Sequence, residues 1–371
     1  MNEGPTDGLR PPGEDIRERL EARDWTQADL AAIMGRDPAD ISDLVTGKRA
    51  VSLDIAKELA AAFGTSAEYW IELDGRYRLT QSEEVDDAIA RRARLYALAP
   101  VKEMVKRHWL EPSEDIAVLE ERLKRYFGIA DLDQAPSLPH AARRKGLEAT
   151  QAEWAWVFRA RHLANAVQAA PFSARSFNRG LASLRSLLPS AQETRRAARV
   201  LADAGIRLLV IEQLPKTAVD GASFWLDRKS PVIALSIRYD RIDCFWFTLA
   251  HELGHIARRD AMSIDTDLAG EGAQPAEEEA EIEANRFAGD FLIPEGSLDS
   301  FIARTRPLYG RQKIQGFAAR LGIHPGIVVG QLQFRQEVPW SAFRPMLEKV
   351  RDTVAQSTLT DGWGHLPPAV E

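Results

Sequence analysis

Two histidines four residues apart constrain this chain more than any other feature of its sequence. His251 and His255 enclose Glu252 in the run HELGH. Residues four apart on a helix lie on one face, so both imidazoles can reach a single ion, and zinc is the ion that such a pair usually binds. Glu252 follows the first histidine, where a carboxylate can act as a general base. The mostly apolar run FWFTLA before the motif predicts that this helix is buried. The alternative is a core helix whose histidines are merely hydrogen-bonded.

A second helical segment, which begins 26 residues after His255, offers a third ligand. Catalytic zinc usually has three protein ligands and one open position. At about 100° per residue, Glu281 and Asn285 share a face with apolar side chains, whereas Glu283 points about 140° away from that face. An acid on an apolar stripe needs a partner, which makes Glu281 the candidate ligand. Asn285 is placed to hold a ligand histidine by its second ring nitrogen. Alternatively, Glu281 only ends an acidic run at a helix start.

These two segments resemble the ImmA/IrrE-type zinc metallopeptidases, bacterial and phage enzymes that relieve repression by cutting a helix-turn-helix repressor. The resemblance rests on FWFTLAHELGH and EIEANRFAGDFLIP, and it extends from GASFWLDRKSPVIALSIRYDRID upstream to LGIHPGIVVGQLQF downstream, roughly the last half of the chain. It implies a gluzincin-like site in which His251, His255 and Glu281 bind Zn²⁺ and Glu252 is the general base. His324 belongs to the matched downstream motif. Its spacing leaves two roles open, a structural histidine or an accessory residue of the active site.

Length and composition indicate a protein of several domains. The chain has 371 residues, of which 45% are hydrophobic and nine are tryptophan, so it can bury substantial cores. No apolar run approaches the ~20 residues of a membrane span, and the N-terminus does not read as a signal peptide. The single cysteine, Cys244, excludes an internal disulfide framework and fits a reducing cytoplasm. We interpret it as a buried packing residue.

The N-terminal part shows a helix-turn-helix pattern. Five short helical patterns end near Leu73; Thr26 predicts the N-cap of the second helix and Gly35 the turn that follows it. Pro38 then predicts the start of a third helix. The run WTQADLAAIMGRDPADISDLVTGKRAVSLDIAKELAAAFGTSAEYWIEL is similar to the lambda-repressor-like (XRE) domains, in particular those of HigA-type antitoxins. That resemblance implies a helix-turn-helix fold for this region.

The charge of this domain does not decide whether it binds DNA or a protein partner. Between Glu14 and Arg78, nine Lys and Arg residues stand against fourteen Asp and Glu residues, a net charge of −5, whereas DNA-reading domains commonly carry a basic face. The third helix is expected to enter the major groove, yet Asp40 and Asp43 lie on its outward side. Five residues are candidate DNA contacts: Gln27, Ser42, Thr46, Lys48 and Arg49. Operator binding as a dimer and a role in dimerisation or partner recognition both remain open.

The rest of the chain divides into a helical part and a mixed part. Residues 79–204 show helical patterns at 89–96, 116–126, 152–169 and 177–188, with a proline-containing loop at 132–139. Three strand signals, at 206–212, 222–226 and 231–237, then lead into the HELGH helix. This order predicts a small sheet beside the zinc helix.

The sequence therefore predicts a multidomain protein in which an all-α helix-turn-helix domain and a helical connector precede an α+β zincin-like metallopeptidase domain. The expected parts are a disordered arm (1–12), the helix-turn-helix domain (13–78), the connector (79–204), the peptidase domain (205–335) and a C-terminal tail (336–371).

The resemblances imply a cytoplasmic zinc-dependent endopeptidase that acts in transcriptional control by cleaving a repressor-type protein, in cis or in trans. Its expected partners are that repressor, operator DNA, a toxin and a second copy of the chain in a homodimer. The alternative is a non-catalytic, HigA-like antitoxin or regulator with a structural or sensory metal site. An open fourth position and an intact Glu252 favour the enzyme, whereas a fourth protein ligand would favour the alternative.

Overall fold

The computed structural model describes residues 10–81, 87–138, 149–268 and 278–367, and it divides the chain into two compact units. The first unit comprises residues 1–89 and the second residues 90–371. Of the arm expected at 1–12, residues 1–9 lie outside the described part, and the first helix begins at Pro12.

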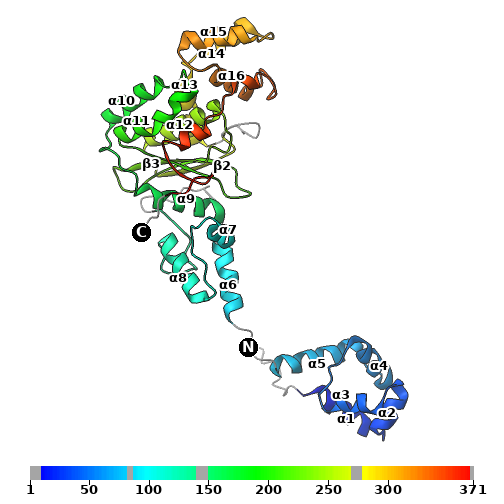
Figure 1. The fold of residues 1–371 in the computed structure, drawn as a ribbon. Coiled ribbons are helices and arrows are strands. Elements are labelled where there is room, and N and C mark those ends of the chain that lie inside the picture. The colour runs from blue at the N-terminus through cyan, green and yellow to red at the C-terminus, as the bar shows by residue number, and fades with distance from the viewer. Residues whose placement is uncertain (1–9, 82–86, 139–148, 269–277, 368–371) are drawn as a thin grey trace. The chain divides into compact units, whose positions relative to one another are not determined.

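Five helices form the first unit, shown in blue in Figure 1: α1 (Pro12–Glu21), α2 (Gln27–Met34), α3 (Pro38–Val45), α4 (Leu53–Phe63) and α5 (Ala67–Gln81). Thr26 and Asp29 form a reciprocal capping box at the start of α2, and Gly35 ends α2 in the left-handed conformation with φ of 67°. Asp37 caps α3. Apolar side chains from all five helices share one buried core, with Trp70 at 0% exposure. The turn between α2 and α3 therefore has the predicted chemistry.

In the described part of the second unit, seven helical elements precede the first strand. They are α6 (Asp87–Leu98), α7 (Val101–Lys106), α8 (Ile116–Phe127), α9 (Gln151–Ala164), α10 (Ala174–Arg185), η1 (Ala191–Arg196) and α11 (Ala197–Ala204). The Trp156 indole donates to the carbonyl of Ile211, and the Arg107 guanidinium donates to the carbonyls of Glu212 and Gln213. The helices expected to form a separate connector thus belong to the unit that contains the sheet, and polar contacts from α9 and the end of α7 bind to the end of its first strand.

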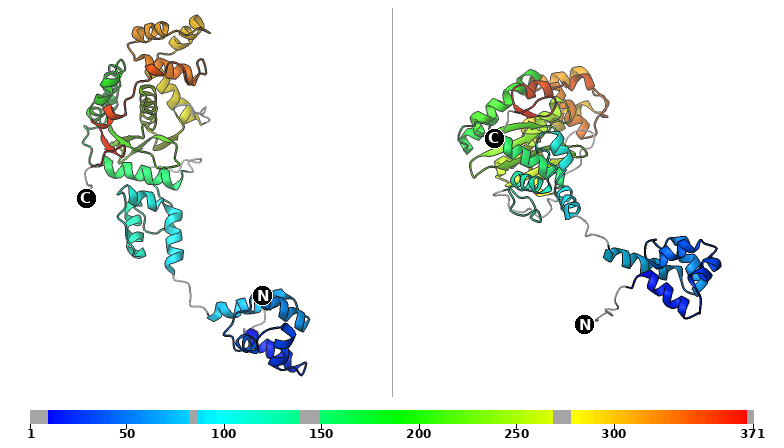
Figure 2. Two further views of the ribbon diagram at one scale, coloured as in Figure 1. Left: turned by 45° about the vertical axis from the view of Figure 1, so that its right-hand side comes forward. Right: turned by 60° about the horizontal axis from the view of Figure 1, so that its bottom comes forward.

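A five-stranded sheet lies at the centre of this unit. Its strands are β1 (Arg207–Ile211), β2 (Val219–Trp225), β3 (Pro231–Leu235), β4 (Met262–Thr266) and β5 (Leu359–Asp361), in the order β4-β2-β3-β1-β5. β1 runs parallel to β3 and β5, and β2 runs antiparallel to β3 and β4. Every residue of β2 and β3 is buried because α9 covers one face of the sheet and α12 the other (Figures 1 and 2).

The C-terminal segment differs from the tail expected at 336–371. Its strand β5 pairs with β1, and the Asp361 carboxylate accepts hydrogen bonds from Trp109 and Arg159. Three residues are too few to show a strand period, and their partners lie far away in the sequence. The segment therefore contributes an edge strand to the sheet and is not a free tail.

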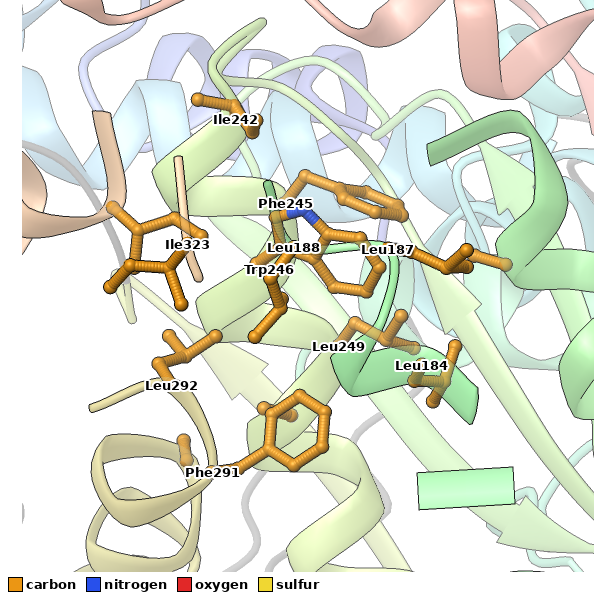
Figure 3. Close-up of a cluster of buried hydrophobic side chains, with 14 of the residues drawn as sticks. Leu184, Leu187, Leu188, Ile242, Phe245, Trp246, Leu249, Phe291, Leu292 and Ile323 are labelled. Carbon is orange, nitrogen blue, oxygen red and sulfur yellow. The ribbon is translucent and has the colours of Figure 1, made fainter. Parts of the chain in front are cut away.

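Helices on the α12 side of the sheet form the main core. They are α12 (Ile242–Arg258), α13 (Glu279–Leu292), α14 (Ser297–Thr305), α15 (Arg311–Leu321), α16 (Pro325–Phe334), η2 (Arg344–Met346) and α17 (Arg351–Ala355). Trp246 and Leu249 of α12 belong to the same buried cluster as Phe291 and Leu292 of α13 (Figure 3). This core fixes α12 and α13 against each other. Among the helices described, none combines the length and apolarity needed to cross a membrane.

Candidate metal centre

A glycine lets α13 approach α12 closely enough to join the two halves of the predicted site. A Cβ atom on Gly254 would lie 3.0 Å from the Cα of Ala284, closer than side chains normally pack. Across this contact, Oε2 of Glu281 lies 3.2 Å from Nε2 of His251 and 3.5 Å from Nε2 of His255. The two Nε2 atoms are 3.0 Å apart. The structure thus brings together the three residues that the sequence pattern singled out.

Acceptors on the far side of each imidazole orient the rings. Nδ1 of His251 lies 3.0 Å from Oδ1 of Asn285, and Nδ1 of His255 lies 2.8 Å from Oδ2 of Asp260. An acceptor at Nδ1 places the ring hydrogen there and leaves a lone pair on Nε2. Both lone pairs face each other and the Glu281 carboxylate. Such an arrangement of electron-rich atoms is stable only around a cation or a shared proton.

The electrostatics of the cluster favour positive charge at this point. Burial opposes protonation of His251, but the neighbouring carboxylates of Asp265 and Glu281 raise its pKa well above the ordinary value. Burial likewise opposes ionisation of Glu281, yet hydrogen bonds to the two histidines lower its pKa. The raised pKa of His251 reports the negative field of the carboxylates, which a divalent cation would also experience.

The donor set fits zinc. Tetrahedral bonds of 2.0–2.1 Å place neighbouring ligand atoms about 3.3–3.4 Å apart. The three ligand–ligand distances of 3.0, 3.2 and 3.5 Å lie close to that value. Two imidazoles and one carboxylate are also a known ligand set of catalytic zinc.

Asp265, which the sequence pattern did not single out, joins this cluster. It lies on β4, directly opposite Gly221 of β2. Its Oδ1 is 3.5 Å from Nε2 of His251, and its Oδ2 is 3.8 Å from Nε2 of His255. One potential ligand atom from each of four residues, His251, His255, Asp265 and Glu281, lies within 4.8 Å of all the others. The only local signal was the alternation Ser-Ile-Asp in a short segment, too brief to identify a strand.

Glu252 is fully buried beside the histidines and faces the sheet. Its Oε2 accepts a hydrogen bond of 3.0 Å from the Ser263 hydroxyl, which is 2.8 Å from the hydroxyl of Ser223. A Cβ on Gly221 would lie 2.3 Å from Oε1, so only glycine lets β2 pass this carboxylate. Burial, aided by the negative Asp265, raises the pKa of Glu252 well above its usual range. A carboxyl group with a raised pKa is suited to proton transfer near neutral pH.

The sequence also singled out His324 and Cys244, and both have structural roles. His324 caps α16, where its Nδ1 accepts a hydrogen bond from the Gly326 N–H and its Nε2 lies 3.1 Å from Glu348. These contacts give His324 a capping role and place it outside the four-residue cluster, so the accessory role is not supported. Cys244 is buried as expected, and burial raises the pKa of its thiol.

The candidate DNA contacts all lie on the exposed surface of the first unit. Two of them already have partners there. Arg49 forms an ion pair with Asp40, and the Thr46 hydroxyl donates to the carbonyl of Ser42 at 2.8 Å. Asp40 also lies 4.0 Å from the Arg36 guanidinium. The repulsion of phosphate expected from Asp40 is therefore reduced by two arginines.

Fold and site together define a class of protein, a helix-turn-helix domain joined to a metallopeptidase-type domain. Residues 16–70 match the helix-turn-helix family model, and residues 202–331 match the model of the IrrE N-terminal-like domain. The chain belongs to the helix-turn-helix regulators through its N-terminal domain, and its C-terminal part contains an IrrE/ImmA-like peptidase domain. These matches confirm both predicted resemblances and the multidomain fold class.

Similar proteins match the N-terminal part. The uncharacterized HTH-type transcriptional regulator YddM of Escherichia coli K12 is 31% identical over 76 residues, which cover 20% of this chain and 81% of that protein. A solved structure of PA4674 from Pseudomonas aeruginosa in complex with its operator DNA is 36% identical and covers 20% of this chain and 83% of that one, with a TM-score of 0.19.

Proposed function

We propose that this chain is a zinc-dependent endopeptidase in transcriptional control, with His251, His255 and Glu281 as zinc ligands and Glu252 as general base. One observation carries the proposal. Two imidazole Nε2 atoms and a carboxylate oxygen, from helices α12 and α13, meet within 3.5 Å of one another. The match to a metallopeptidase-type family supports it.

Each group of the site has its own role in the proposed reaction. Zinc, when bound, supplies a Lewis acid that polarises the scissile carbonyl and activates water. Asn285 and Asp260 hold the two imidazoles by Nδ1, so that Nε2 stays available. Ser263 fixes one oxygen of Glu252, and the other oxygen accepts the proton of the attacking water and later delivers it to the leaving amine.

The sheet offers a place for the substrate. β4 is the edge strand nearest the cluster, and a peptide can bind an edge strand through backbone hydrogen bonds alone. By the family resemblance, we propose that the substrate is a helix-turn-helix repressor or the N-terminal unit of a second copy of this chain. The helix-turn-helix family match supports operator binding by the first unit. Such binding implies action in the cytoplasm.

A second candidate function follows from Asp265. Structural zinc sites have four protein ligands, and Asp265 makes four potential ligands here. This observation favours a regulator in which metal binding stabilises or signals, without peptide cleavage.

The endopeptidase and the non-catalytic regulator can be distinguished by one experiment. The wild-type chain is incubated with tagged Glu252→Gln chain and with purified helix-turn-helix repressors. We expect new fragments from one of these targets, dependent on zinc and traced by mass spectrometry to the target's own sequence. Intact targets after incubation with fully zinc-loaded wild-type protein would support the non-catalytic regulator instead.

A further inference from the structure

We propose that Asp265 is a fourth protein ligand of the metal, and that edge strand β4 thereby holds the site closed. This inference rests on the proposed zinc site formed by His251, His255 and Glu281. It adds to that site a resting state in which Asp265 occupies the position required by water until a bound target displaces it.

The first argument for Asp265 as a ligand is its distance from the two histidines. Its carboxylate oxygens lie 3.5 Å from Nε2 of His251 and 3.8 Å from Nε2 of His255. Neighbouring ligand atoms of tetrahedral zinc are separated by about 3.3–3.4 Å. With one oxygen toward each imidazole, Asp265 therefore lies within reach of a fourth ligand position. In a catalytic zinc site, that position is the open one.

The second argument for Asp265 as a ligand is its buried environment. Only 6% of its surface is exposed, and its Oδ2 has no hydrogen-bond partner among the residues that the structure describes. A buried carboxylate requires compensation by donors or a cation. The other buried aspartates of the second unit each pair with an arginine: Asp220 with Arg238, Asp243 with Arg241 and Asp361 with Arg159. Asp265 instead faces two imidazoles, and a metal ion bound between them would supply the positive charge that an arginine supplies to the other three.

The strand that bears Asp265 also contacts the proposed base. Ser263 and Asp265 are two residues apart on β4, so their side chains point to the same face of the sheet. Ser263 binds Glu252 and Asp265 faces the histidines. β4 is five residues long, lies at the sheet edge and pairs with β2. A shift of this one strand would open the fourth position and release Glu252 together.

Cobalt substitution of the full-length protein tests the assignment without any peptidase assay. Co²⁺ takes the place of Zn²⁺ in sites of this ligand type, and its visible spectrum changes when azide occupies an open position. We expect azide to leave the wild-type spectrum unchanged and to alter that of Asp265→Ala. Loss of an outer partner of a ligand costs about 10–100-fold in metal affinity, so Asp265→Ala should lower zinc affinity by at least about tenfold against a chelator.

Asp267→Ala is the matched control. Asp267 lies two residues further on, pairs with Arg238 and carries the same charge, so its removal should leave both readouts as in the wild type. Asp265→Asn keeps the side-chain shape and serves if the alanine variant misfolds by circular dichroism. It should weaken zinc binding in the same direction.

The possible outcomes distinguish the fourth-ligand inference from the peptidase proposal. A wild-type cobalt spectrum that responds to azide as strongly as that of Asp265→Ala, with equal zinc affinities, would overturn the inference while leaving the peptidase proposal intact. An azide response confined to the Asp265 variants, together with absence of cleavage by every form, would support the fourth ligand and refute the peptidase. A wild-type chain that binds neither metal would overturn both.

Discussion

Glu281 and Glu283 are two residues apart on α13, yet they meet different partners. Glu281 lies within 3.5 Å of both ligand histidines, whereas Glu283 forms an ion pair with Arg258 on the helix exterior. We predict that Glu281→Gln loses most of its zinc during dialysis against a chelator, because one of the anionic ligands is gone. Glu283→Gln, with the same change of charge, should retain it. The reverse order of metal contents would show that the helix face is assigned wrongly.

Asn285 acts on the site through His251. Its Oδ1 is 3.0 Å from Nδ1 of that ring. We predict that Asn285→Ala lowers zinc affinity about 10–100-fold, because the ring loses the acceptor that fixes its orientation and tautomer. Asp290→Ala is the control, since Asp290 is exposed on the same helix. Equal affinities in a competition with a fluorescent chelator would remove Asn285 from the metal centre.

At the scale of elements, Gly221 sets how closely β2 approaches α12. A Cβ on Gly221 would meet Oε1 of Glu252 at 2.3 Å, whereas one on Gly289 of α13 would meet nothing within 4 Å. We predict that Gly221→Ala lowers the free energy of unfolding by about 1–3 kcal/mol through overpacking and displaces Glu252. Gly289→Ala should raise it by about 0.5–1 kcal/mol through helix propensity. Urea denaturation of both variants measures this, and equal stabilities would contradict the close approach of β2 to α12.

Elements with local signals could be predicted from the sequence, and those that depend on distant pairing could not. The capping box at Thr26, the left-handed Gly35 and the one-face spacing of His251 and His255 are all encoded within a few residues. Glu281 followed from the helical period of α13. Asp265 did not, because only the pairing of β4 with β2 brings it to the histidines. The contact of Asp260 with His255 likewise depends on the chain reversal after α12.

At the scale of the whole molecule, an acidic chain must bind DNA through few basic groups. The formal net charge of the chain is −7, and Lys48 is an exposed cation three residues after the end of α3. We predict that Lys48→Ala weakens binding to every DNA sequence alike, whereas substitution of Ser42 or Gln27 changes sequence preference. Wild-type binding should have a shallow salt dependence, because few counterions are displaced.

Titrations against the DNA upstream of its own gene, at two salt concentrations, test this prediction. Lys57→Ala is the control, because Lys57 is exposed on α4, outside α2 and α3. Equal losses for Lys48→Ala and Lys57→Ala would show that α3 is not the docking helix. No binding at low salt would favour a role of the first unit in protein recognition.

The central claim is that one zinc ion and Glu252 together cleave peptide bonds. Zinc titrated into chelator-stripped wild-type and Glu252→Gln chains, with bound metal and cleaved target measured in the same samples, tests it most directly. We predict that both chains bind one equivalent, that the wild type regains cleavage in proportion, and that Glu252→Gln cleaves nothing, because glutamine cannot accept the proton. Equal cleavage by the two zinc-loaded chains would contradict the account.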